Sequence, residues 1–79
     1  MLTLDEIILY KEYNGDPTWM AKSDRGKEKD WDKIGDLVLH LSLVKAGLAS
    51  EDLRIKTEKE LSEQVESDEA RDFLKSLAK

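Results

Sequence analysis

Hydrophobic residues in the middle of the chain recur at steps of three or four, which predicts an amphipathic helix over residues 30–46. The row consists of seven residues: Trp31, Ile34, Leu37, Val38, Leu41, Val44 and Leu48. Asp30 is a suitable N-cap, and Gly47 stands where a helix C-terminus favours glycine. Leu39 and Leu43 fall on the far side of this helix, which is therefore apolar on two faces. Such a helix is usually covered from both sides, so we expect residues 30–47 to form the centre of the fold.

The N-terminal segment predicts a helix over residues 4–13. Thr3 followed by Glu6 matches a capping box, in which the hydroxyl and the carboxylate each satisfy a free backbone N–H. Asn14-Gly15 is a helix stop, since both residues tolerate the left-handed conformation. A strand through residues 7–10 is the competing interpretation, because that run is rich in strand formers. The cap and the stop favour the helix.

The C-terminal half predicts two further helices, over residues 51–65 and 68–77, each preceded by a serine that can act as its N-cap. The serines are Ser50 and Ser67. The first helix has an apolar face of Leu53, Leu61 and Val65, and the second has one of Ala70, Phe73, Leu74 and Leu77. Short connections before and between these helices predict that consecutive helices pack as antiparallel neighbours.

The segment between the first helix and the central one contains a possible short turn and a loop. Asp16-Pro17 can begin a turn of helix, and residues 22–29 are charged and carry no apolar side chain. With 79 residues in all, we expect a single small domain over residues 1–79. The predicted fold class is all-α, a bundle of three to four helices around the central one.

Composition narrows the function more by exclusion than by indication. The chain has 18 acidic and 13 basic side chains, a net charge of -5, one histidine and no cysteine. Cysteine chemistry and two-histidine metal motifs are therefore excluded. The acid excess disfavours non-specific binding to nucleic acid or to an anionic membrane. The apolar runs are too short to span a bilayer and the first residues lack a basic signal region, so we expect a cytoplasmic protein.

No sequence motif indicates catalysis, a metal ion or a cofactor. Phosphate-binding glycine loops and the nucleophile-elbow pattern are absent, and His40 has no serine or cysteine motif beside it. The aspartates around residues 16–32 do not have the spacing of an EF-hand loop. We therefore expect a protein that is not an enzyme and that uses no cofactor or metal.

Two groups of residues are candidates for an interaction surface. The candidates are Tyr10, Tyr13, Asp16, Trp19, Trp31, Leu39 and Leu43. Tyrosine and tryptophan are enriched at binding hot spots, but the same rings can instead pack the end of a small core. The two leucines are covered either by another helix of this chain or by a partner, which includes a second copy.

These observations together favour a small acidic module that binds another protein, of the inhibitor, immunity or accessory-regulator type. The expected partner is another protein, for which a basic one is an option, or a second copy of the chain. The alternative is a nucleic-acid-associated regulator of the helix-turn-helix kind. Residues 50–65 offer Arg54, Lys56, Lys59 and Gln64 for such a role, but five acidic residues lie among them. Nucleic acid is therefore the less expected partner.

Overall fold

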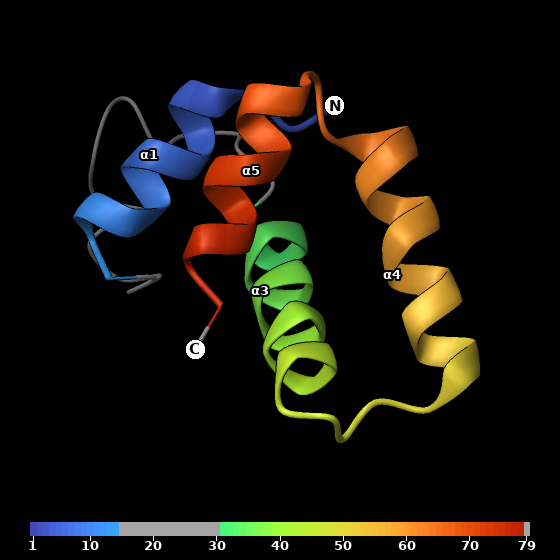
Figure 1. The fold of residues 1–79 in the computed structure, drawn as a ribbon. Coiled ribbons are helices and arrows are strands. Elements are labelled where there is room, and N and C mark those ends of the chain that lie inside the picture. The colour runs from blue at the N-terminus through green and yellow to red at the C-terminus, as the bar shows by residue number, and fades with distance from the viewer. Residues whose placement is uncertain (15–30, 79) are drawn as a thin grey trace.

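The structure is a computed structural model, and it describes residues 1–14 and 31–78. This part of the chain forms four helices (Figure 1): α1 (Leu4–Glu12), α3 (Trp31–Lys45), α4 (Glu51–Gln64) and α5 (Asp68–Ser76). The predicted all-α bundle is confirmed, and residues 7–10 lie in a helix rather than a strand. The predicted turn at Asp16-Pro17, the predicted loop at residues 22–29 and the Asp30 cap lie outside the described residues.

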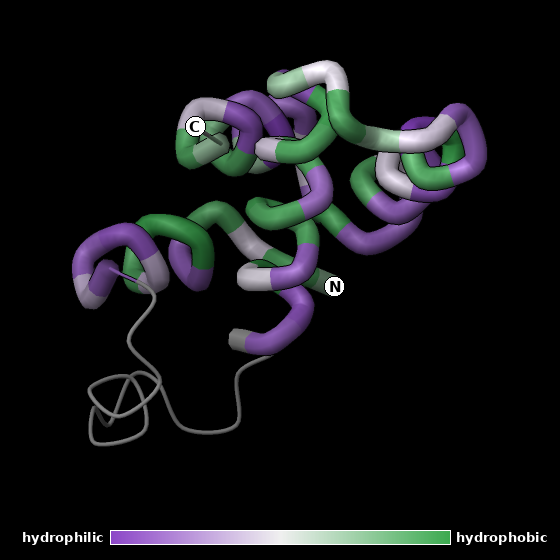
Figure 2. The backbone as a smooth tube through the Cα atoms, turned by 90° about the horizontal axis from the view of Figure 1, so that it is seen from below, coloured by the Kyte–Doolittle hydropathy of each residue, from purple (hydrophilic) through white to green (hydrophobic). Residues whose placement is uncertain are grey.

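The α3 helix is the centre of the bundle, as predicted, although within the described residues only one of its two apolar faces is covered, since Leu39 is exposed. It contacts α1, α4 and α5, and α1 lies beside α5 (Figure 1). Three of its residues, Ile34, Leu37 and Leu41, are buried and form what we call the inner row. Hydrophobic and hydrophilic positions alternate along the helices (Figure 2), and the apolar sides meet in one core. The buried members of this core are Leu2, Ile7, Ile34, Leu37, Leu41, Leu61, Val65, Ala70, Leu74 and Ala78.

The N-termini of α1, α4 and α5 are capped in the same way, and all three predicted caps are confirmed. In each, a hydroxyl oxygen accepts a hydrogen bond from the backbone N–H three residues further on. The pairs are Thr3 with Glu6 at 3.2 Å, Ser50 with Leu53 at 3.2 Å, and Ser67 with Ala70 at 3.1 Å. The capping box of α1 differs from its predicted form in one respect. The carboxylate of Glu6 accepts from the Thr3 hydroxyl, at 3.3 Å, instead of from a backbone N–H.

The C-terminus of α3 is closed by two backbone hydrogen bonds around Gly47, which has a φ of +73°. The N–H of Gly47 donates to the carbonyl of Val44 (3.1 Å), and the N–H of Leu48 donates to that of Leu43 (2.9 Å). This is the Schellman arrangement that glycine favours, and it confirms the predicted helix stop. Leu48, assigned by its spacing to the apolar row, is 75% exposed, so that assignment was wrong. The left-handed Gly47 turns the chain off the helix before Leu48 can continue the row.

The prediction that consecutive helices pack as neighbours is confirmed for α3 with α4 and wrong for α4 with α5. The α5 helix packs mainly against α1 and α3. Val65, between α4 and α5, has extended backbone angles (φ -106°, ψ 128°) and pairs with Leu2 as an isolated parallel bridge. The Leu2 N–H donates to the Gln64 carbonyl (2.6 Å), and the Glu66 N–H donates to the Leu2 carbonyl (2.9 Å). The extended Val65 redirects the chain, so α5 crosses to α1 instead of folding back on α4.

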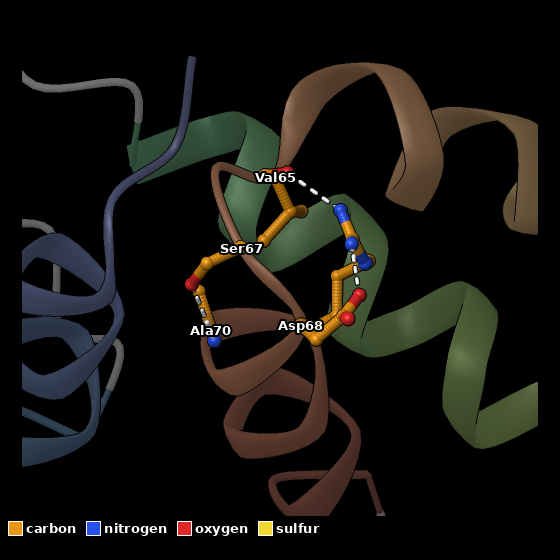
Figure 3. Close-up of polar contacts among 5 residues, drawn as sticks. Val65, Ser67, Asp68 and Ala70 are labelled. Atoms are coloured by element: carbon orange, nitrogen blue, oxygen red, sulfur yellow. Dashed lines mark hydrogen bonds and ion pairs between the residues drawn. The ribbon is translucent and has the colours of Figure 1, made fainter.

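The connection between α4 and α5 is also held by side chains of α5 (Figure 3). The Nη1 atom of Arg71 donates to the Val65 carbonyl at 2.9 Å, and its Nη2 atom pairs with the carboxylate of Asp68. Ser67 caps the same helix through the N–H of Ala70. One short connection is therefore fixed by the N-terminal segment on one side and by α5 on the other.

Candidate protein-binding surface

The side of α3 that faces away from the inner row carries two predicted site residues, Leu39 and Leu43. Asp32 and Asp36 precede them at steps of four and three, so all four residues lie on one side of the helix. Leu39 is 56% exposed, Leu43 is half-buried, and both aspartates are exposed. We call these four residues the α3 outer face. Within the described part of the chain, α1, α4 and α5 leave Leu39 uncovered.

The α3 outer face combines apolar area with negative charge. Leu39 and Leu43 lie one helical turn apart and are followed by the exposed Ala46, so the apolar residues form a strip. Neither Asp32 nor Asp36 has an ion-pair partner within residues 1–14 and 31–78. Their charge is therefore not neutralised by a neighbouring side chain of that part of the chain. Such a face matches an apolar surface with lysine or arginine at its edge.

The aromatic candidates are placed differently from the two leucines. Tyr10 is half-buried and packs against the core, and its Oη atom lies 3.5 Å from the position that a Cβ on residue 35 would take. That is an ordinary van der Waals distance, so a Cβ at residue 35 would fit beside Tyr10. Tyr13 is half-buried at the C-terminus of α1. Trp31 begins α3, where only its backbone is described, and Asp16 and Trp19 lie outside the described residues.

A hollow of about 420 Å³ lies where the C-terminus of α1 meets α3 and α5. It is lined by Tyr10, Lys11, Asn14, Val38, Ser76 and Leu77. The Lys11 ammonium lies 5.5 Å from the centroid of the Phe73 ring, a cation–π distance that links α1 to α5. Among the described residues that line it, Tyr10 and Lys11 carry titratable side chains.

The chain's one histidine is packed between other groups. The Nδ1 atom of His40 is buried and has no hydrogen-bond partner in the described part of the structure. A catalytic histidine is usually oriented by a hydrogen bond from one ring nitrogen to a carboxylate or carbonyl.

The residues described include no group of three or more histidine, cysteine, aspartate or glutamate side chains that could hold a metal ion. No helix among them is both long enough and apolar enough to cross a membrane.

The structure also exposes Ile55, a residue that the sequence analysis did not select. Its side chain is 62% exposed on α4. The signal was present in the pattern, because Ile55 is two residues from Leu53 and so lies on nearly the opposite side of the helix. Ile55 is also flanked by Arg54 and Lys56, which indicates that this stretch faces outward. An apolar residue out of phase with its helix's buried face identifies a second exposed apolar site.

Comparison with protein-family models, curated proteins and solved structures found no match to this chain. Its function must therefore be inferred from its own surface. On that surface, the α3 outer face is the feature that combines exposed leucine with charge of one sign.

Proposed function

We propose that this protein is a non-catalytic module that binds another protein through the α3 outer face. The observation that carries the proposal is the exposure of Leu39, in the middle of a helix whose inner row is buried. Single exposed apolar residues are common on protein surfaces and need no function. On one side of α3, however, Leu39 is followed by Leu43 and Ala46, and the three residues form an apolar strip that a partner can cover.

The chemistry of the face favours a basic partner. Asp32 and Asp36 border the leucines and stay exposed, and the chain as a whole has a net charge of -5. Charge of one sign attracts a partner of the other sign and speeds its association at low salt. Burial of the leucine side chains would contribute about 25 cal/mol per Å² of apolar area, and the surplus over the entropic cost of association would appear as affinity. Inhibitors, immunity proteins and accessory regulators all work by covering a partner in this way.

Nucleic-acid binding is the alternative, and the surface of α4 gives it less support. Arg54, Lys56 and Lys59 are exposed there, as a recognition helix requires. Glu51, Asp52 and Glu58 are exposed on the same helix. DNA or RNA phosphates would repel these carboxylates, and this repulsion would offset the attraction between the phosphates and the lysine and arginine side chains. A mobility shift of short duplexes at low salt would favour this alternative over a protein partner.

The test compares three forms of the full chain as bait in an extract of the native cell. Leu39→Glu places a charge in the α3 outer face, and Ile55→Glu places the same charge at an equally exposed isoleucine on α4. We expect the wild type and Ile55→Glu each to recover a stoichiometric partner. Leu39→Glu should fail to recover it. With the purified partner, Leu39→Glu should weaken binding roughly tenfold or more, because a central apolar contact is removed.

Two results would overturn the proposal. One is the absence of any stoichiometric partner for the wild type, with circular dichroism showing that the bait is folded. The other is a partner that binds Leu39→Glu as tightly as it binds the wild type. Binding that strengthens at higher salt would contradict the role of Asp32 and Asp36, because screening weakens attraction between opposite charges.

A further inference from the structure

A groove separates α4 from α5, and α3 forms its floor. It consists of two adjoining hollows, of about 400 Å³ and about 260 Å³, which share Val44 and Glu58. The larger one lies along the first half of α4, beside Ile55. The smaller one reaches α5 and Ala78, which follows that helix. We call the two hollows together the α4–α5 groove.

The two walls of the α4–α5 groove differ in charge. On α4, the exposed Ile55 lies between Glu51 and Glu58, one turn away on either side, and Arg54 lines the same hollow, so this wall has two carboxylates and one guanidinium. On the opposite wall, Lys75 of α5 is exposed, and Lys45 of α3 donates through Nζ to the Ala78 carbonyl at 3.3 Å. This hydrogen bond holds the Lys45 ammonium at the edge of the groove. Neither glutamate and neither lysine has an ion-pair partner within the described ranges 1–14 and 31–78.

We propose that the α4–α5 groove binds a second copy of this chain, whose α4 helix enters it. The outward side of α4 carries Ile55 with two carboxylates and one guanidinium, a net negative charge, and α3 and α5 offer an apolar floor at Val44 beside two ammonium groups. The helix and the groove are therefore complementary in both polarity and charge. Ile55 of the second copy contacts Val44, and its Glu58 pairs with Lys75.

A twofold symmetric dimer satisfies every one of these contacts twice. In such a dimer the same patch is used by both copies, so that if residue 58 of one copy meets residue 75 of the other, the reverse also holds. Here α4 is both the wall of its own groove and the element that enters the groove of the second copy. A head-to-tail arrangement would leave one Ile55 unpaired at one end and one groove empty at the other.

The proposed contact involves only a short part of α4. Residues 51–58 cover about two turns of helix, or roughly 11 Å. A contact confined to two turns of helix buries less area than the standard interface, which buries about 800 Å² per partner. We therefore expect a weak dimer, whose dissociation constant rises as salt is raised. The α3 outer face lies on the other side of α3 from the inner row and takes no part.

The test measures the mass of the full chain by sedimentation velocity over a wide range of concentration. We expect the mass to rise from that of the 9.1 kDa monomer toward twice that value. Ile55→Glu should raise the dissociation constant roughly tenfold or more. Glu58→Lys and Lys75→Glu should each weaken the dimer, because each places like charges together. The double variant restores opposite charges at both symmetric contacts and should recover most of the affinity.

Leu39→Glu is the matched control, since it adds the same charge outside the groove and should leave the dimer unchanged. Thermal unfolding at a concentration where the chain is monomeric checks that each variant is folded. A chain that stays monomeric at the highest concentration overturns the proposal, as does a dimer that Ile55→Glu leaves intact. A dimer that is lost with Leu39→Glu and kept with Ile55→Glu would also overturn it. None of these results depends on whether the α3 outer face binds a basic protein.

Discussion

The two sides of α3 carry the same kind of residue in different surroundings. Leu37, in the inner row, is 1% exposed, whereas Leu39, two positions later, is 56% exposed. Both are leucines in the middle of one helix and differ only in the direction they face. Contacts with α1, α4 and α5 bury the inner row, and within the described residues no helix covers Leu39. Because Leu37 is buried, it determines stability. Because Leu39 is exposed, its side chain is accessible to a partner.

The largest expected effect comes from truncating the inner row. Leu37→Ala removes a fully buried side chain and leaves a cavity, so we expect the free energy of unfolding to fall by about 2–5 kcal/mol. A domain of this size has a small margin of stability, and a loss at the upper end would leave much of the protein unfolded. Urea denaturation followed by circular dichroism measures the change. Leu37→Met, which nearly conserves volume, is the control and should cost less than about 1.5 kcal/mol.

A loss below about 1 kcal/mol for Leu37→Ala would contradict the comparison, because such a small value is typical of a partly exposed site. The central position of α3 would then be wrong as well. The same urea series on Leu37→Met distinguishes the effect of creating a cavity from a general sensitivity of the helix to substitution.

A smaller effect is expected at the turn that brings α4 back along α3. Gly47 has a φ of +73°, and a Cβ there would meet nothing within 4 Å. Gly47→Ala therefore introduces no clash with another residue and tests the backbone alone. The left-handed conformation costs an L-residue roughly 1–2 kcal/mol, and we expect that loss in the free energy of unfolding. Gly47→Asn should lose less, because asparagine tolerates this conformation better.

Equal stability of Gly47→Ala and the wild type, measured by the same denaturation, would show that the turn adopts another conformation in solution. The Schellman hydrogen bonds of Gly47 and Leu48 would then not direct α4 against α3.

Local chemistry predicted most of the fold from the sequence. The caps at Thr3, Ser50 and Ser67, and the stop at Gly47, depend on residues within four positions of one another, so each could be identified directly. The inner row followed from a period of three to four residues. The helix ends agree with the predicted ranges to within one residue at every end that the structure describes.

Contacts between distant parts of the chain could not be predicted in this way. The bridge between Leu2 and Val65 joins residues far apart in sequence, and no local pattern indicates it. The placement of α5 against α1 depends on that bridge, which explains why a short connection suggested the wrong neighbour. Of the candidate surface, the pattern placed Leu39 and Leu43 opposite the inner row, but only the positions of α1, α4 and α5 decide that Leu39 is exposed. Ile55 was identifiable from its phase relative to Leu53 and from its charged neighbours, although the sequence analysis did not select it.

The smallest expected effect is at Leu39 itself. Leu39→Ala removes apolar atoms that already contact solvent, and alanine is at least as good a helix former as leucine. We expect the free energy of unfolding of the isolated chain to change by less than about 0.5 kcal/mol, measured by the same urea denaturation as for Leu37→Ala. The contrast between the two alanine variants isolates the effect of burial, because the residue type, the helix and the substitution are the same.

A loss above about 1.5 kcal/mol for Leu39→Ala would break the comparison, since only a covered leucine produces a value of that size. The α3 outer face would then belong to the core of the folded chain, and the proposed binding of a basic protein would lose its basis. The concentration dependence of the result separates two origins of such a loss. A loss that persists at a concentration where the chain is monomeric arises within one chain, whereas one that vanishes on dilution arises from contact between copies.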